Sequence, residues 1–194
     1  AETDISIEDL IQEREMAVII SHHGYVKRVS LDTYRIQGRG GTGVIGGDAK
    51  DDDFIEHLFV ASTHDDLLCF TNTGRVFRLK VYEVPELNRT SRGRAIVNLI
   101  DLREGEQVRA FLTIKDFERS SDFLTFVSSQ GIVKRTALKE YRNVHKAGII
   151  AVGLKEGDSL LDVAVTKGAE EIVHETPARM ELSIKKNDTQ LIRQ

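Results

Sequence analysis

Residues 69–78 read Cys-Phe-Thr-Asn-Thr-Gly-Arg-Val-Phe-Arg, and this pattern decides the fold because residues 19–28 and 126–135 repeat it. Each copy contains an apolar run, a polar turn that closes on glycine, and a second run of the form Gly-x-Val-x-Arg. Glycine suits the positive-φ position of a β-hairpin, where the Cβ atom of another residue would clash. The sequence therefore predicts a β-hairpin in each copy. The turn glycines are Gly24, Gly74 and Gly131.

The similarity between the copies extends past the hairpins. Leu31-x-x-Tyr34 corresponds to Leu138-x-x-Tyr141, and residues 104–106 and 156–158 form a second shared turn signal, acid-Gly-acid. Successive hairpin glycines lie 50 and 57 residues apart, which fits a four-stranded propeller blade better than a helical repeat. A fourth copy begins at Leu160 and departs from the pattern after residue 168. We expect an all-β, propeller-like fold of about three to four four-stranded blades.

The outgoing strand of each hairpin places its side chains alternately on two faces. Three valines share one face by this period, and the arginines two residues later share it as well. These residues are Val26, Val76 and Val133, followed by Arg28, Arg78 and Arg135. We expect the arginines to lie near the strand ends, where their charged heads reach water.

Composition limits the class of protein. The 194 residues are 40% hydrophobic and 30% charged, as in an ordinary soluble domain. No apolar run approaches the roughly 20 residues that a membrane-spanning helix needs. The single Cys69 excludes an internal disulfide framework, which fits a cytoplasmic protein. The start of the chain is acidic, so we assign residues 1–15 as a linker and residues 16–194 as the domain.

The formal net charge of −4 conceals three basic segments, at residues 22–43, 74–94 and 131–146. A polyanion responds to the local field of such segments rather than to the total charge. Their matching positions in the copies favour contacts with the phosphates of duplex DNA. A propeller that serves as a protein-interaction scaffold, with basic residues in solvated turns, is the alternative. The candidate DNA contacts are Arg35, Arg39, Arg75, Arg89, Arg92, Arg94, Lys134, Lys139, Arg142 and Lys146.

Other motifs are weaker indications of chemistry. Residues 38–43 match Gly-x-Gly-x-x-Gly, but no helix-forming segment follows them, so a dinucleotide site is not expected. The stretch can instead be a connecting loop, or a loop whose backbone and Arg39 approach phosphates. Neither His22-His23 nor the aspartates at 51–53 have partners at metal-ligand spacing. We therefore predict no catalytic residue, cofactor or metal site in this chain.

Four stretches, residues 57–65, 71–76, 80–86 and 89–93, resemble the C-terminal domain of the DNA gyrase A subunit. The resemblance covers residues 8–167 and implies a β-pinwheel, a propeller-like disc of four-stranded blades with swapped strands. It also implies that duplex DNA bends or wraps around a basic rim, which supports ATP-dependent negative supercoiling by the whole enzyme. The catalytic tyrosine and the ATPase of that family lie elsewhere, so the chain is expected to be no enzyme on its own.

Partners and location follow from the same resemblance. Beside double-stranded DNA, the implied partners are the gyrase B subunit, together with the remainder of the gyrase A subunit. The whole enzyme uses ATP and magnesium. The implied location is the cytoplasm, associated with the nucleoid and not with a membrane. The isolated domain is expected to be a monomer.

The signature box of the family reads Gln-basic-Arg-Gly-Gly-basic-Gly. Five positions of this sequence match it: Gln37, Arg39, Gly40, Gly41 and Gly43. Gly38 and Thr42 stand at the two variable basic positions, and the loss of both cations predicts weaker wrapping. The incomplete box also leaves an alternative, the C-terminal domain of the topoisomerase IV A subunit, which bends DNA without a full wrap.

Overall fold

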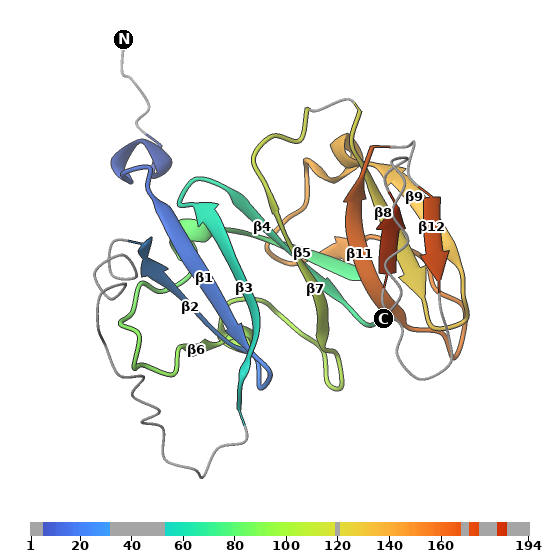
Figure 1. Ribbon diagram of the computed structural model, residues 1–194, viewed down its shortest axis with the longest axis horizontal. Coiled ribbons are helices and arrows are strands. Elements are labelled where there is room, and N and C mark those ends of the chain that lie inside the picture. The colour runs from blue at the N-terminus through green and yellow to red at the C-terminus, as the bar shows by residue number, and fades with distance from the viewer. Residues whose placement is uncertain (1–5, 32–52, 119–120, 168–170, 175–181, 186–194) are drawn as a thin grey trace. The chain divides into compact units, whose positions relative to one another are not determined.

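The computed structural model describes residues 6–31, 53–118 and 121–167, together with two further strands at 171–174 and 182–185 (Figure 1). The strands are β1 (Glu15–Ser21), β2 (Tyr25–Ser30), β3 (Ile55–Ser62), β4 (Asp66–Thr71), β5 (Arg75–Lys80), β6 (Arg94–Ala95), β7 (Val108–Ile114), β8 (Phe123–Ser128), β9 (Val133–Ala137), β10 (Ile149–Ile150), β11 (Leu160–Thr166), β12 (Glu171–His174) and β13 (Leu182–Lys185). Short 3-10 helices are η1 (Glu8–Leu10), η2 (Val81–Glu83), η3 (Ile96–Asn98) and η4 (Leu138–Tyr141). The predicted all-β fold is confirmed. No helix in these ranges has the length and apolarity needed to cross a bilayer.

The three predicted hairpins are present as β1–β2, β4–β5 and β8–β9. In each turn the glycine amide donates to the carbonyl oxygen three residues earlier, over 2.9 to 3.0 Å. The φ angles of Gly24, Gly74 and Gly131 are 80°, 84° and 78°, as the hairpin position requires. At Gly74 a Cβ atom would also collide with the carbonyl oxygen of Val152, so no other residue fits this turn.

Each four-stranded sheet is completed by strands from the following repeat (Figure 1). The first sheet has the order β3-β1-β2-β6 and the second β10-β5-β4-β7. In both, the hairpin is flanked on one side by the strand that leads into the next hairpin. On the other side lies a two-residue strand, β6 in the first sheet and β10 in the second, which follows the next hairpin in the chain. The swapped strands implied by the resemblance are therefore present in both four-stranded sheets.

The third sheet, β11-β8-β9, has three strands within the described residues. This difference explains why one of the three motif valines is exposed while the other two are buried. Val26 and Val76 are fully buried beside β6 and β10, whereas Val133 is 45% exposed at the edge of β9. The fourth copy contributes the antiparallel pair β12–β13, and the segment between these strands lies outside the described residues.

The chain forms two compact units, residues 1–67 with 79–101 and residues 68–78 with 102–194. The first unit contains the first sheet. In the second unit, the second and third sheets share one hydrophobic core, in which Phe70 and Phe126 meet edge to face with ring centroids 5.7 Å apart. The buried Tyr141 hydroxyl donates to the Ala151 carbonyl oxygen over 2.9 Å. β1 begins at Glu15, and the assignment of a linker before it remains a prediction.

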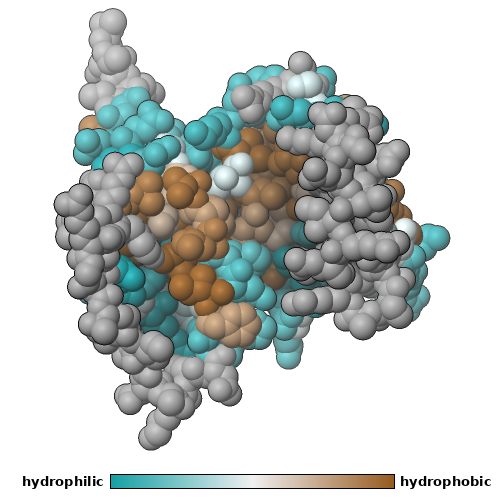
Figure 2. All heavy atoms as spheres, in the orientation of Figure 1, coloured by the Kyte–Doolittle hydropathy of each residue, from teal (hydrophilic) through white to brown (hydrophobic). Residues whose placement is uncertain are grey.

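One face of the first unit is apolar. Figure 2 shows hydrophobic side chains gathered over its sheet, and Leu58 and Val60 on β3 are more than half exposed. Lys27, which is opposite Ile19 on the same face, is buried. Among the described residues of the first unit, the exposed cations are Arg14, which is paired with Glu86, and three arginines on the loop that leads into β6 and at the start of that strand.

Candidate nucleic-acid interface

The loop between η2 and β6 and the first residue of β6 carry three of the predicted DNA contacts. Arg89, Arg92 and Arg94 are all exposed, and the guanidinium of Arg92 lies 4.0 Å from the centroid of the Tyr25 ring. The loop ends at Gly93, whose φ is 106° and whose Cβ position would lie 2.9 Å from the Val26 carbonyl oxygen. Glycine is therefore required there, because the loop backbone passes directly against β2.

Hydrogen bonds fix the backbone of this loop from two sides. On the outer side, the Asn88 side-chain oxygen accepts from the Ser91 amide at 2.8 Å and from the Thr90 hydroxyl at 3.0 Å. From below, the ammonium of Lys27 on β2 donates to the carbonyl oxygens of Asn88, Arg89 and Ser91, at 3.3, 2.7 and 2.6 Å. Sequence reasoning missed Lys27. The signal in the sequence is only a lysine in the interior of a predicted strand, and the segment that covers it begins 61 residues further along the chain.

The second unit carries the other exposed candidates. Lys134 lies on β9, Lys139 in η4, and Arg142 and Lys146 in the loop from η4 to β10. Arg142 forms an ion pair with Glu118 at 3.9 Å, and both side chains are more than half exposed. An exposed ion pair of this kind contributes little to stability, so it does not prevent Arg142 from binding a phosphate.

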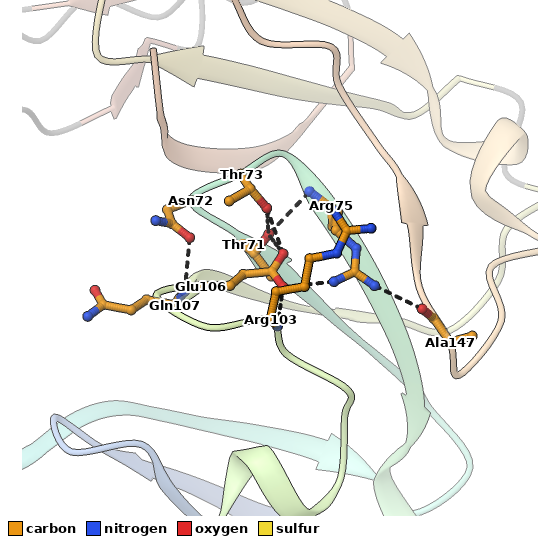
Figure 3. A network of polar contacts seen from close by, with 8 residues as sticks. All are labelled: Thr71, Asn72, Thr73, Arg75, Arg103, Glu106, Gln107 and Ala147. Atoms are coloured by element: carbon orange, nitrogen blue, oxygen red, sulfur yellow. Dashed lines mark hydrogen bonds and ion pairs between the residues drawn. The ribbon is translucent and has the colours of Figure 1, made fainter. Parts of the chain in front are cut away.

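Arg75 does not belong with these exposed cations, contrary to our prediction. Its guanidinium lies 2.7 Å from a carboxylate oxygen of Glu106 and donates to the Ala147 carbonyl oxygen at 3.0 Å. The other Glu106 oxygen accepts from the hydroxyls of Thr71 and Thr73, at 2.7 and 2.6 Å (Figure 3). Because the Arg75 side chain is only 11% exposed and engaged inside the second unit, we exclude it from the interface.

The motif arginines Arg28 and Arg78 both bind the repeat that follows, and Arg28 differs from expectation because its side chain is largely buried. Arg28 donates to the Val84 carbonyl oxygen at 2.7 Å, and Arg78 donates to that of Arg142 at 2.6 Å. Val84 and Arg142 directly follow η2 and η4 as their C-cap residues, where helix carbonyls lack partners within the helix. In both repeats the arginine therefore binds the carbonyl oxygen of the C-cap residue of the 3-10 helix in the next repeat. Its role is structural. The side chain of Arg28 is only 13% exposed.

A carboxylate lies beside each hairpin turn. Asp53 accepts from the His23 amide at 2.9 Å, Glu106 accepts from Thr71 and Thr73, and Asp158 accepts from the Gln130 amide at 3.0 Å. Burial alone would raise the pKa of each group, but hydrogen bonds from the turn and its surroundings lower the pKa of all three below the ordinary value. These acids hold the turns through contacts within the fold, although the second carboxylate oxygen of Asp158 is buried without a hydrogen-bond partner.

The remaining predictions are placed as follows. His22 and His23 lie in the first turn as expected, where the His22 ring stacks on Phe54 with centroids 4.7 Å apart. Six candidate contacts lie outside the described residues: Arg35, Gln37, Arg39, Gly40, Gly41 and Gly43. Within the described ranges, no group of three or more His, Cys, Asp or Glu side chains is placed to hold a metal ion.

Three consecutive stretches of the chain, residues 15–62, 65–115 and 122–167, match the model of the family described as DNA gyrase C-terminal domain, beta-propeller. The chain belongs to this family. Each match contains one of the three hairpins, so the repeats seen in the sequence are the repeats of the gyrase C-terminal domain.

Relatives and solved structures agree with this assignment. The A subunit of DNA gyrase from Clostridium acetobutylicum is 44% identical over 173 residues, which cover 89% of this chain and 21% of that protein. The chain therefore spans about a fifth of the length of this curated relative. The C-terminal domain of DNA topoisomerase IV is 30% identical with a TM-score of 0.70, covering 84% of this chain and 49% of that one. A DNA gyrase A C-terminal domain is 25% identical with a TM-score of 0.59, covering 83% and 51%.

Proposed function

We propose that this chain is a duplex-DNA-binding module of a type IIA topoisomerase, the A subunit of DNA gyrase, and that it bends or wraps DNA through the phosphates. One observation carries the proposal. Exposed arginines and lysines recur on the segment that follows the 3-10 helix in two successive repeats, and hydrogen bonds from the preceding hairpin hold both segments. Membership of the gyrase C-terminal domain family supports the same function.

The chemistry of these cations favours the DNA backbone over the bases. Arginine and lysine heads on exposed loops can reach phosphate oxygens without entering a groove, and such contacts position DNA without reading its sequence. Arg89, Arg92 and Arg94 form one set in the first unit. Lys134, Lys139, Arg142 and Lys146 form a second set in the second unit. Binding is therefore expected to be strong at low salt and indifferent to sequence.

The wider role is part of the proposal. The module would work with the gyrase B subunit, as well as with the remainder of the gyrase A subunit, in the cytoplasm at the nucleoid. It would support negative supercoiling that uses ATP and magnesium. The curated relative favours gyrase. The incomplete box, with Gly38 and Thr42 at the basic positions, favours the weaker bending of a topoisomerase IV A subunit.

A protein-interaction scaffold is the second candidate function. The observation that favours it is the apolar face of the first sheet, where Ile55, Leu58 and Val60 are all more than half exposed. Exposed apolar patches often mark protein contacts. This candidate requires no affinity for DNA.

Ligation of nicked circular DNA in the presence of the chain tests bending or wrapping. A wrapped path of fixed hand shifts the mean linking number of the sealed circles, which a gel resolves. We expect a shift that Arg39→Ala reduces more than it reduces affinity, because the cations of the described loops still hold the duplex. Gly38→Arg combined with Thr42→Arg should enlarge the shift. If Arg39→Ala leaves the shift unchanged, the box loop is only a connector.

A further inference from the structure

Lys27 is a buried cation beneath the loop that carries Arg89, Arg92 and Arg94. The residue is 7% exposed, and its ammonium uses all three of its N–H donors on loop carbonyl oxygens. Burying a charge is costly unless it is well satisfied, and a methionine of similar length would avoid that cost. The fold therefore retains a costly cation at a place where it fixes the loop backbone.

We propose that Lys27 is a positioning residue for DNA binding: it fixes residues 88–91 so that Arg89, Arg92 and Arg94 meet the phosphates as a preformed set. The proposal rests on the proposed function and adds a residue that does not itself touch DNA. Its physical basis is conformational entropy. Each flexible side chain or loop that is ordered on binding reduces affinity, and a loop fixed beforehand avoids part of that cost.

Charge supports the same role. Burial and then the nearby charge of Arg89 lower the pKa of Lys27, so the two cations lie close enough to repel each other. A phosphate bound at the loop would reduce this repulsion, because an anion stabilises neighbouring cations. Lys27 therefore adds to the positive potential of the loop from below while it orders the backbone.

The second unit holds its corresponding loop with a different cation. Three residues after the hairpin glycine, where the first copy has Lys27, the second copy has Phe77. There Arg75 binds the loop instead, through the Ala147 carbonyl oxygen next to Gly148, and its guanidinium lies 4.6 Å from the centroid of the Phe77 ring. In both units a cation of the preceding hairpin thus fixes the loop backbone that carries the exposed basic residues.

The test is a double-mutant cycle on the whole chain, with a fluorescent DNA duplex as the probe. The duplex has about 40 base pairs, so that it extends past any one set of basic residues. We expect Lys27→Met to weaken binding roughly tenfold, because the loop side chains must then be ordered on binding. Arg89→Ala should weaken binding in both backgrounds, but the fold-loss in the Lys27→Met background should be smaller by a factor of at least about three than the fold-loss in the wild type. The two losses differ because the effects of coupled residues are not additive. Lys115→Met, which removes an exposed cation outside the candidate interface, is the control and should change affinity less than about twofold.

Asn88→Ala provides a second variant that leaves the buried site intact. It removes the acceptor that orders Thr90 and Ser91 from the solvent side, so it should weaken binding in the same direction. Wild-type affinity in Lys27→Met, with the full Arg89→Ala effect retained, would overturn the positioning role and leave the proposed function standing. A wild-type chain that does not bind the duplex would overturn both.

Discussion

Replacing Arg89, Arg92 and Arg94 together with alanine should lower duplex affinity about 100-fold at roughly 0.1 M salt, because three phosphate contacts of roughly six are lost. The change should act mainly on binding, since all three side chains are exposed and Gly93, which the backbone requires, is retained, although Arg92 also loses its contact with the Tyr25 ring. Fluorescence anisotropy with a labelled duplex measures the loss. The salt dependence should become shallower at the same time, by about 0.9 in slope for each contact removed.

A charge-matched control separates a local contact from an effect of total charge. Arg109, Lys115 and Lys155 are exposed cations outside the candidate interface, and their triple alanine variant has the same net charge. We expect this control to bind within about threefold of the wild type, because distant exposed charges are screened at that salt. Equal losses in the two triple variants would mean that the 88–94 loop is not the binding surface.

Glu106→Gln should destabilise the fold by about 3 kcal/mol at neutral pH, since it leaves one member of a buried ion pair without its partner. In the wild type the Glu106 carboxylate accepts four hydrogen bonds, from Thr71, Thr73, Arg75 and the Arg103 amide. A glutamine amide would turn an N–H group toward one of these donors. Urea unfolding followed by circular dichroism measures the loss. Glu104→Gln, at an exposed neighbour, should change stability by less than about 0.5 kcal/mol.

The pH dependence of this difference provides an independent check. Burial alone would raise the pKa of Glu106, but hydrogen bonds from Arg103, Thr73 and Thr71 and the charge of Arg75 lower it below the ordinary 4.5. A carboxylate with a lowered folded pKa contributes stability that is fully present above its unfolded pKa and is lost as the pH falls through the folded value. The difference in unfolding free energy between the wild type and Glu106→Gln should therefore become smaller as the pH falls below 4.5. A difference in unfolding free energy that stays constant down to acid unfolding would show that the charge of Glu106 does not stabilise the fold.

Much of the fold could be predicted from local sequence. The turns at Gly24, Gly74 and Gly131 are visible because only glycine adopts their positive φ without strain, and their spacing indicates the length of a blade. The exposure of Val133 could not be predicted in this way. It depends on whether a two-residue strand from a later repeat covers the edge of β9, and a motif read along one strand contains no such information.

The candidate interface was predictable only in part, because sequence reasoning treated every cation in a basic segment alike. Arg89, Arg92 and Arg94 are exposed as expected. Arg75 lies in the same kind of segment, but its partner Glu106 is 31 residues away in the chain, so its burial followed from tertiary structure alone. Lys27 was missed for the same reason, since the carbonyls of Asn88 and Arg89 that it binds are 61 and 62 residues distant.

The most direct test of the account is a titration of duplex binding against salt. If exposed arginines and lysines hold the DNA by about six phosphates, log K should fall with log salt with a slope near about −5, and duplexes of unrelated sequence should give the same line. Measurements from about 50 to about 300 mM salt on two unrelated duplexes of equal length provide the comparison. No binding at the lowest salt, a slope shallower than about −2, or a strong preference for one duplex would contradict recognition through the phosphate backbone.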